Sequence, residues 1–93
     1  MTNDPGPYDI QVTRPAEHQL ARLTEGAAAA IVEFMLGALI DNPYRVGGPL
    51  QRELAGLRSA RRGAYRIVYE IFDDDLLVVV HRIDHRSTVY RTR

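Results

Sequence analysis

Apolar residues in the first half of the chain recur with two periods, first that of a strand and then that of a helix. Residues 8–12 alternate between apolar and polar, which predicts a short strand. Pro15 suits the first turn of a helix, and apolar residues at helical spacing continue to about Thr24. From Glu25 a wider apolar stripe runs to the polar stop at residues 41–43. This half therefore predicts one strand and two helices, of which the second contributes most to the core.

The second half of the chain predicts three strands. After a loop at residues 43–49, rich in glycine and proline, Leu54–Ala60 is predicted as a weak strand and Tyr65–Phe72 as a strong one. Leu76–Asp84 contains an unbroken aliphatic run, which is typical of a strand buried on both faces. The acidic turn Asp73–Asp75 joins the last two strands into a hairpin.

The strong strand has two different faces, because alternate side chains of a strand point to opposite sides. One face carries Tyr65, Ile67, Tyr69 and Ile71, and the other carries Arg66, Val68, Glu70 and Phe72. If the helices cover the first face, the second is an open platform that can carry arginines. The predicted order is β-α-α-β-β-β, a single small α+β domain in which a helical hairpin packs on a mostly antiparallel four-stranded sheet. Residues 1–7 are predicted to form a flexible tail and residues 8–93 the domain.

Length and composition narrow the class of protein. A chain of 93 residues makes one small domain, which buries only about 60 to 65% of the surface of the unfolded chain. The sequence has no cysteine, which excludes disulfides and thiolate metal sites. The apolar stretch Ala27–Ile40 is interrupted by Glu33 and Gly37 and is shorter than the roughly 20 residues that span a bilayer. Residues 1–25 lack the pattern of a signal peptide, so we expect a cytoplasmic protein.

Histidines give no sign of a metal centre. His81 and His85 are predicted on one face of the last strand, but four residues of strand separate them by roughly 13 Å, too far to share a metal. His18 is predicted on the outer helix. We therefore expect neither a metal nor another cofactor.

The charge of the chain is unevenly distributed and its cations are all of one kind. All 12 basic residues are arginine; residues 1–55 hold four of them against seven acids, and residues 56–93 hold eight against five. The guanidinium group is always charged and its planar set of donors matches phosphate. A GC-rich genome would also replace lysine by arginine, but it would not cluster arginines in one half. The clustering favours phosphate recognition by the C-terminal half.

The basic half carries a motif that resembles a known family. The run Tyr65–Tyr69 (YRIVY), followed by the acidic hairpin and then Arg86 and Tyr90, resembles the RelE branch of the RelE/ParE toxins. The resemblance extends from Tyr8 to Tyr90, and around residues 57–63 it is especially close to mycobacterial RelE-type toxins. It implies a RelE-like fold and the toxin of a type II toxin–antitoxin system. It also implies a ribosome-dependent endoribonuclease that cuts mRNA in the ribosomal A site without a metal.

The resemblance implies specific catalytic residues. In the implied reaction the ribose 2′-OH attacks the adjacent phosphate in line, leaving a 2′,3′-cyclic phosphate and a 5′-OH. Arg66, Arg86 and Arg61 match basic positions that stabilise charge on the phosphate. Tyr90 matches a C-terminal tyrosine that stacks on or orients the base, and His85 is the candidate proton shuttle.

The chain departs from the enterobacterial pattern at two lysines, where Leu57 and Ser59 stand. Arginine keeps its charge and is a poor base, so nearby arginines can replace these lysines only electrostatically. Further RNA-binding candidates are Arg58, Arg62 and Arg82. Simpler interpretations also hold for the motif: Arg61 and Arg62 could form a solvated turn, Arg66 could pair with Glu70 or Glu53, and Tyr90 could close the end of the sheet.

The resemblance also implies partners. These are the ribosome and mRNA, and a cognate antitoxin, encoded adjacently, that wraps the domain and binds operator DNA on behalf of the complex. No membrane is implied. Two other functions stay open: a ParE-like inhibitor of DNA gyrase, and a toxin that blocks the A site without cleaving.

Overall fold

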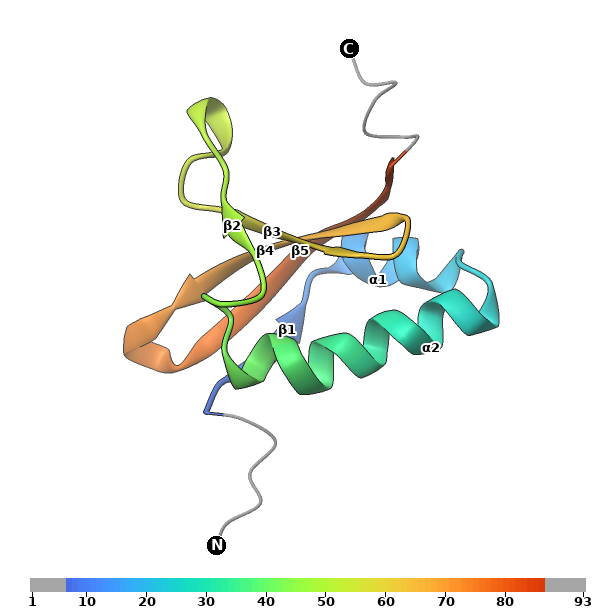
Figure 1. Cartoon of the computed structure of the whole chain (residues 1–93), viewed down its shortest axis with the longest axis horizontal. Coiled ribbons are helices and arrows are strands. Elements are labelled where there is room, and N and C mark those ends of the chain that lie inside the picture. The colour runs from blue at the N-terminus through green and yellow to red at the C-terminus, as the bar shows by residue number, and fades with distance from the viewer. Residues whose placement is uncertain (1–6, 87–93) are drawn as a thin grey trace, which may run out of the picture.

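The computed structural model describes residues 7–86, which form a five-stranded sheet with helices on one side (Figure 1). In chain order the elements are β1 (Asp9–Val12), α1 (Arg14–Ala21), α2 (Glu25–Phe34), the π-helical turn η1 (Met35–Leu39), β2 (Gly48–Pro49), the 3₁₀ turn η2 (Arg52–Leu54), β3 (Arg58–Arg62), β4 (Tyr65–Phe72), the 3₁₀ turn η3 (Asp73–Asp75) and β5 (Leu77–His85). The strand order is β1-β5-β4-β3-β2. The predicted α+β class is confirmed.

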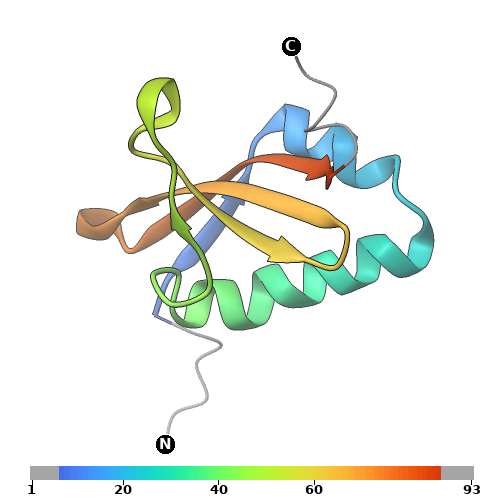
Figure 2. The ribbon, with the colours of Figure 1, turned by 45° about the horizontal axis from the view of Figure 1, so that its top comes forward.

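The number of strands differs from the prediction by one. The additional strand, β2, has two residues and is too short to leave an alternating pattern in the sequence. It pairs antiparallel with β3, as β3 does with β4 and β4 with β5, while β1 joins β5 in parallel. Figure 2 shows β3, β4 and β5 side by side in the middle of the sheet.

Threonines begin both helices. The Thr13 hydroxyl accepts from the backbone N–H of Ala16, and the Thr24 hydroxyl accepts from that of Ala27, so each satisfies a donor that a helix N-terminus otherwise leaves free. Pro15 occupies the first turn of α1, as predicted. The single long helix expected from Glu25 widens into the π-helical turn at its C-terminal end.

The core lies between the helices and one face of the sheet. Fully buried side chains are contributed by α1, the α2–η1 helix, β4 and β5: Ala16, Ile31, Leu39, Ile67, Tyr69, Val78 and Val80. Tyr69 donates a hydrogen bond to the carbonyl of Pro43 at 2.6 Å, and burial raises the pKa of its phenol. The predicted alternation of β4 is thus observed, with its helix-facing side chains in the core.

Two strand predictions were wrong in detail. The weak strand predicted at Leu54–Ala60 is observed at Arg58–Arg62, because Arg52 (φ 60°) and Gly56 (φ 97°) turn the chain just before it. The aliphatic run of β5 is fully buried on one face only, since Val78 and Val80 are inaccessible whereas Leu77 and Val79 are partly exposed. None of the helices within residues 7–86 covers the second face (Figure 1).

A β-bulge interrupts the pairing of β4 with β5. Tyr69 lies opposite Val80 and Val68 lies opposite Arg82, which leaves His81 as the extra residue on β5. A bulge re-aims the side chains that follow it. As a result His81 and His85 lie on opposite faces of the sheet, not on one face as predicted.

None of the helices in the described part of the chain is long and apolar enough to cross a membrane.

Candidate functional site

The face of the sheet without helices carries a row of charged side chains, which we call the arginine platform (Arg61, Arg66, Arg82 and Asp84). Arg61 on β3 lies directly opposite Arg66 on β4, and Arg66 lies directly opposite Asp84 on β5. Arg82 precedes Asp84 by two residues and so lies on the same side of β5. Three strands therefore bring together four charges that are spread over 24 residues of sequence.

Two cations of the platform have no counter-ion within the described residues. Among residues 7–86 the acidic side chains in contact with a basic one are Glu70, hydrogen-bonded to His81 at 3.0 Å, and Asp84, paired with Arg82 at 2.7 Å. Glu70, a predicted partner of Arg66, is therefore engaged by His81 instead. Like charges directly opposite each other on neighbouring strands are destabilising. Arg61 and Arg66 thus form a concentrated positive charge, which favours an anionic ligand.

The third arginine is held by the carboxylate of Asp84. Nε and Nη2 of Arg82 donate to the same oxygen, Oδ2, at 3.1 and 2.7 Å. The Arg82 side chain is 52% exposed, whereas that of Asp84 is 9% exposed. Arg82 is therefore partly neutralised from within the sheet.

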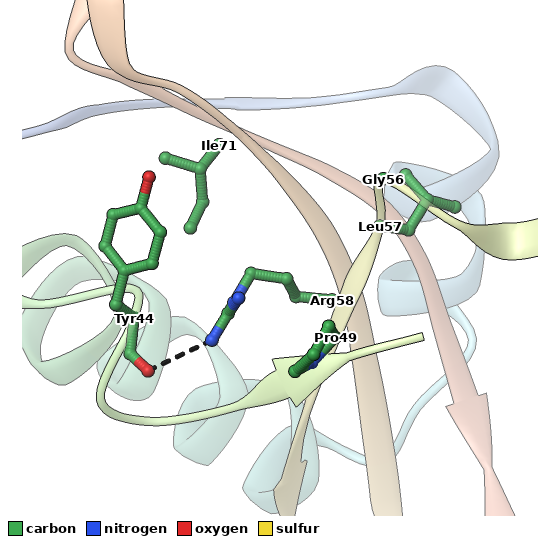
Figure 3. Close-up of a pocket in the computed structure, with 6 residues that line it drawn as sticks. All are labelled: Tyr44, Pro49, Gly56, Leu57, Arg58 and Ile71. Atoms are coloured by element: carbon green, nitrogen blue, oxygen red, sulfur yellow. Dashed lines mark hydrogen bonds between the residues drawn. The ribbon is translucent and has the colours of Figure 1, made fainter. Parts of the chain in front are cut away.

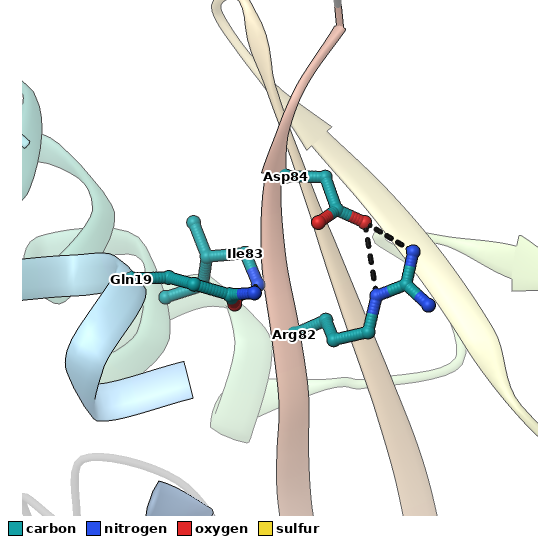
Figure 4. A network of polar contacts seen from close by, with 4 residues as sticks. All are labelled: Gln19, Arg82, Ile83 and Asp84. Atoms are coloured by element: carbon teal, nitrogen blue, oxygen red, sulfur yellow. Dashed lines mark hydrogen bonds and ion pairs between the residues drawn. The ribbon is translucent and has the colours of Figure 1, made fainter. Parts of the chain in front are cut away.

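Helix α1 fixes the segment of β5 that carries this pair. Beyond Val80, where pairing with β1 ends, the Thr13 hydroxyl donates to the carbonyl of His81 at 3.1 Å, and Gln19 Oε1 accepts from the N–H of Ile83 at 2.7 Å. Figure 4 shows Gln19 on one side of β5 and the Arg82–Asp84 pair on the other. The backbone between the two charged residues is thus tied to a helix.

Arg58 and Arg62 lie on the opposite, helix-covered face. Arg58 donates to the carbonyls of Tyr44 and Gly47 at 3.1 and 2.9 Å, and its guanidinium lies 5.1 Å from the centre of the Tyr44 ring. Arg62 lies over the ring of Phe34 at 5.8 Å. The structure therefore separates these two predicted RNA-binding residues from the arginine platform.

A shallow hollow of about 190 Å³ lies beside Arg58 (Figure 3). Its lining is mostly apolar and comprises Tyr44, Pro49, Gly56, Leu57, Arg58 and Ile71. The loop that forms one wall is tied to the tip of the β4–β5 hairpin, since Tyr44 donates a hydrogen bond to the Asp73 carboxylate. The same carboxylate accepts a hydrogen bond from Tyr8, which directly precedes β1. The bond from Tyr44, and then that from Tyr8, lowers the pKa of Asp73, and the bond to Asp73 raises the pKa of Tyr44 to about 12.

The remaining predicted catalytic residues lie at the end of β5. His85 makes an edge-on ring contact with Tyr65 at 5.1 Å. The backbone N–H of Arg86 donates to the carbonyl of Ala64 at 2.8 Å, which holds the start of the C-terminal segment against the β3–β4 turn. Tyr90 lies outside the described residues. Within residues 7–86, no group of three or more histidine, cysteine or acidic side chains is placed to hold a metal.

Comparison with known proteins identifies the family. Residues 10–90 match the family described as the ParE toxin of the type II toxin–antitoxin system parDE. The chain belongs to the RelE/ParE family of toxins. It is 49% identical over 85 residues to toxin RelG of Mycobacterium tuberculosis, covering 91% of this chain and 98% of that one, and 48% identical over 89 residues to toxin RelE of the same organism, covering 96% and 92%.

A solved structure agrees with these relatives. The toxin–antitoxin complex RelBE2 of Mycobacterium tuberculosis contains a chain that superposes with a TM-score of 0.84 at 49% identity, covering 88% of this chain and 94% of that chain. The resemblance to mycobacterial RelE-type toxins is therefore confirmed, and this protein is a type II toxin of that kind.

Leu57 and Ser59, which stand where enterobacterial members of the family have lysines, lie in different surroundings. Ser59 lies on the open face, in register with Val68, while Leu57 lines the hollow beside Arg58. Neither residue can transfer a proton as a lysine does.

Sequence reasoning missed Asp84 as a member of the arginine platform and Gln19 as a support of the strand that carries it. The acid two residues after Arg82 was a usable signal for Asp84, because residues i and i+2 of a strand share a face. No sequence signal marks Gln19, whose role depends on where β1 stops pairing with β5.

Proposed function

We propose that this RelE/ParE toxin cleaves mRNA in the ribosomal A site and that the arginine platform binds the scissile phosphate. The observation that carries the proposal is the side-by-side position of Arg61 and Arg66 without a counter-ion in the described chain. Folding two cations together costs stability, and phosphate is the ligand that their geometry suits. The two mycobacterial relatives are named toxin RelG and toxin RelE, which agrees with the RelE branch from which this activity is proposed.

The proposed chemistry needs charge stabilisation more than it needs a cofactor. The 2′-OH attacks the phosphorus and the bond to the 5′-oxygen breaks, so negative charge grows on the phosphate oxygens. Guanidinium groups held in place before the substrate arrives stabilise that charge without reorganising. In our proposal Arg66 and Arg61 supply this stabilisation, Arg86 adds a further cation, Tyr90 orients the base and His85 transfers a proton.

The test is to map mRNA 5′ ends in a purified translation system with wild-type toxin, Arg66→Ala, and wild-type toxin on mRNA without ribosomes. We expect codon-phased cuts only with wild-type toxin and ribosomes, and a loss of about a hundredfold or more for Arg66→Ala. Arg45→Ala is the matched control, because Arg45 is exposed on a loop away from the platform. A folded Arg66→Ala protein that cuts like wild type would contradict the assignment.

The partner of the toxin is proposed to be a cognate antitoxin encoded by a neighbouring gene. The similar mycobacterial structure is itself a toxin–antitoxin complex. A segment that covers the arginine platform would block the proposed phosphate site, and acidic residues would complement it. We further propose that the complex binds its operator DNA through the antitoxin and that the toxin acts in the cytoplasm, where ribosomes are found.

The second candidate is inhibition of DNA gyrase, which the ParE description of the matched family favours. The same translation assay separates the candidates. Uninterrupted translation together with inhibited gyrase supercoiling would support the gyrase function. Arrested translation without cut ends would indicate a toxin that blocks the A site.

A further inference from the structure

Asp84 is the one charged side chain that is buried among the described residues, with 7% of the residue exposed. A buried carboxylate is costly unless it is paired and hydrogen-bonded. This one lies inside the arginine platform, although a phosphate-binding surface gains nothing from an extra negative charge. The position of this carboxylate among the arginines therefore indicates a role other than stabilising the fold.

The carboxylate is aimed at Arg82 and lies across from Arg66. Both hydrogen bonds from Arg82 use Oδ2, and Oδ1 accepts no hydrogen bond from the described residues. Arg66 is the direct cross-strand neighbour of Asp84 and has Arg61 on its other side. The carboxylate of Asp84 thus binds Arg82 through one oxygen, and Asp84 also stands at the end of the cross-strand row that contains Arg61 and Arg66.

The local backbone is built to keep this arrangement. The bulge at His81 sets the two residues after it in their register with β4, and Gln19 holds the N–H of Ile83, which lies between Arg82 and Asp84. The backbone that carries the pair is therefore held by β4 and by α1, and Arg82 cannot turn toward a ligand without breaking its two bonds to Asp84.

We infer that Asp84 is a positioning residue of the arginine platform. It withdraws Arg82 from phosphate binding and neutralises it, so that the substrate phosphate is attracted to Arg61 and Arg66 and not to Arg82. This inference rests on the proposed function, because it concerns where the scissile phosphate is held.

The inference predicts opposite changes in binding and in turnover. Asp84→Asn keeps the size of the side chain but removes its charge, and so adds a competing cation to the platform. We expect half-saturation at a lower toxin concentration, a steeper salt dependence by roughly one phosphate contact, and a kcat that falls about tenfold or more because the RNA is misplaced. A residue that only stabilised the fold would weaken binding and turnover together.

The experiment measures single-turnover cleavage of mRNA on programmed ribosomes as a function of toxin and salt concentration. It compares wild type, Asp84→Asn, Asp84→Glu and the double variant Arg82→Ala/Asp84→Asn. The double variant has the same net charge as wild type and lacks the competing cation, so both its salt dependence and its kcat should return toward the wild-type values. Asp84→Glu should recover part of the lost kcat.

The outcomes separate this inference from the proposed function. If wild-type toxin cuts nothing on ribosomes, the proposed function fails. If wild type cuts and Asp84→Asn has unchanged affinity, salt dependence and kcat, the positioning role is overturned while the function stands. A parallel loss of affinity and kcat in both Asp84→Asn and the double variant, with a lowered unfolding temperature, would likewise overturn it in favour of a structural role.

Discussion

Arg61 and Arg62 are neighbours on β3, yet they lie on opposite faces of the sheet and in opposite environments. On the helix-covered face, Arg58 donates to two backbone carbonyls and stacks on Tyr44, and Arg62 lies over Phe34. On the open face, Arg61 and Arg66 lie opposite each other with no counter-ion among the described residues. The helix-covered face uses its arginines to hold loops and rings together, whereas the open face leaves its two cations available.

This difference shows that the clustering of arginines along the sequence does not define the binding surface. Because successive residues of a strand point to opposite faces, one basic run contains both residues with a structural role and residues with a proposed ligand. Arg82 occupies an intermediate position, since it lies on the open face and is nevertheless paired, to Asp84. The positively charged surface available to the proposed RNA ligand is therefore smaller and more localised than the count of arginines indicates.

The largest expected effect comes from replacing each of the two neighbours on β3, Arg61 and Arg62, by alanine. Arg61→Ala should reduce ribosome-dependent cleavage by about a hundredfold, because it removes a preorganised donor from the platform. Arg62→Ala should change cleavage little, because its guanidinium faces Phe34. Cleavage rates on programmed ribosomes, with circular dichroism to confirm the fold of each variant, test the pair. Equal losses in both variants would show that the face of the strand does not decide function.

A second pair of neighbours tests the helix-covered face. A Cβ on Gly47 would lie 2.5 Å from the Tyr69 hydroxyl and would collide with the carbonyl of Ser59, whereas a Cβ on Gly48 would meet nothing within 4 Å. Gly47→Ala should therefore lower the free energy of unfolding by about 2 kcal/mol or more, as overpacking of a core does.

The matched control is Gly48→Ala, for which we expect almost no change in stability. Urea unfolding of both variants gives the comparison. The kcat of the folded Gly47→Ala fraction should remain near that of wild type, because the clash is on the face opposite the arginine platform. A stable Gly47→Ala protein would mean that the loop relaxes away from β3 and does not brace it.

The sequence predicts parts of this molecule with very different success, for physical reasons. Alternation predicts β4 with its correct bounds, since a buried face and a half-exposed face give a clear period of two. The start of β3 escapes prediction, because it depends on left-handed backbone at Arg52 and Gly56. The bulge at His81 also escapes, because a continuous aliphatic run carries no register.

The candidate site was also predictable from the sequence only in part. Arg61 and Arg66 were predicted from a family motif that lies within one hairpin, and the register shows them side by side. The pairing of Arg82 with Asp84 and the support from Gln19 depend on how β5 meets α1, which is tertiary information. Assignment of Tyr90 and His85 to catalysis stays a prediction.

The smallest expected effect concerns the exposed hydrogen bonds that Tyr44, in the loop beside the hollow, and Tyr8, just before β1, donate to Asp73 at the tip of the β4–β5 hairpin. The bonds from Tyr44 and Tyr8 lower the pKa of Asp73 in the folded protein below its ordinary value of 3.8, so the unfolded chain binds this proton more readily. Their stabilisation is complete above that ordinary value and is lost as the pH falls through the lower, folded value. Because all three side chains are exposed or nearly so, the expected shift in unfolding temperature is small.

Comparing the unfolding temperatures of wild type and Tyr44→Phe between neutral and acidic pH isolates this contribution. The two proteins should differ at neutral pH and converge in strong acid, where Asp73 is protonated in both. In alkali the same bond keeps Tyr44 protonated until about pH 12, so wild type should also lose its advantage as the pH rises from the ordinary tyrosine range toward that value. Arg66→Ala, on the other face, should leave the difference between the two proteins unchanged. A difference that persists undiminished in strong acid would show that Tyr44 stabilises the loop by packing on Arg58 and not through Asp73.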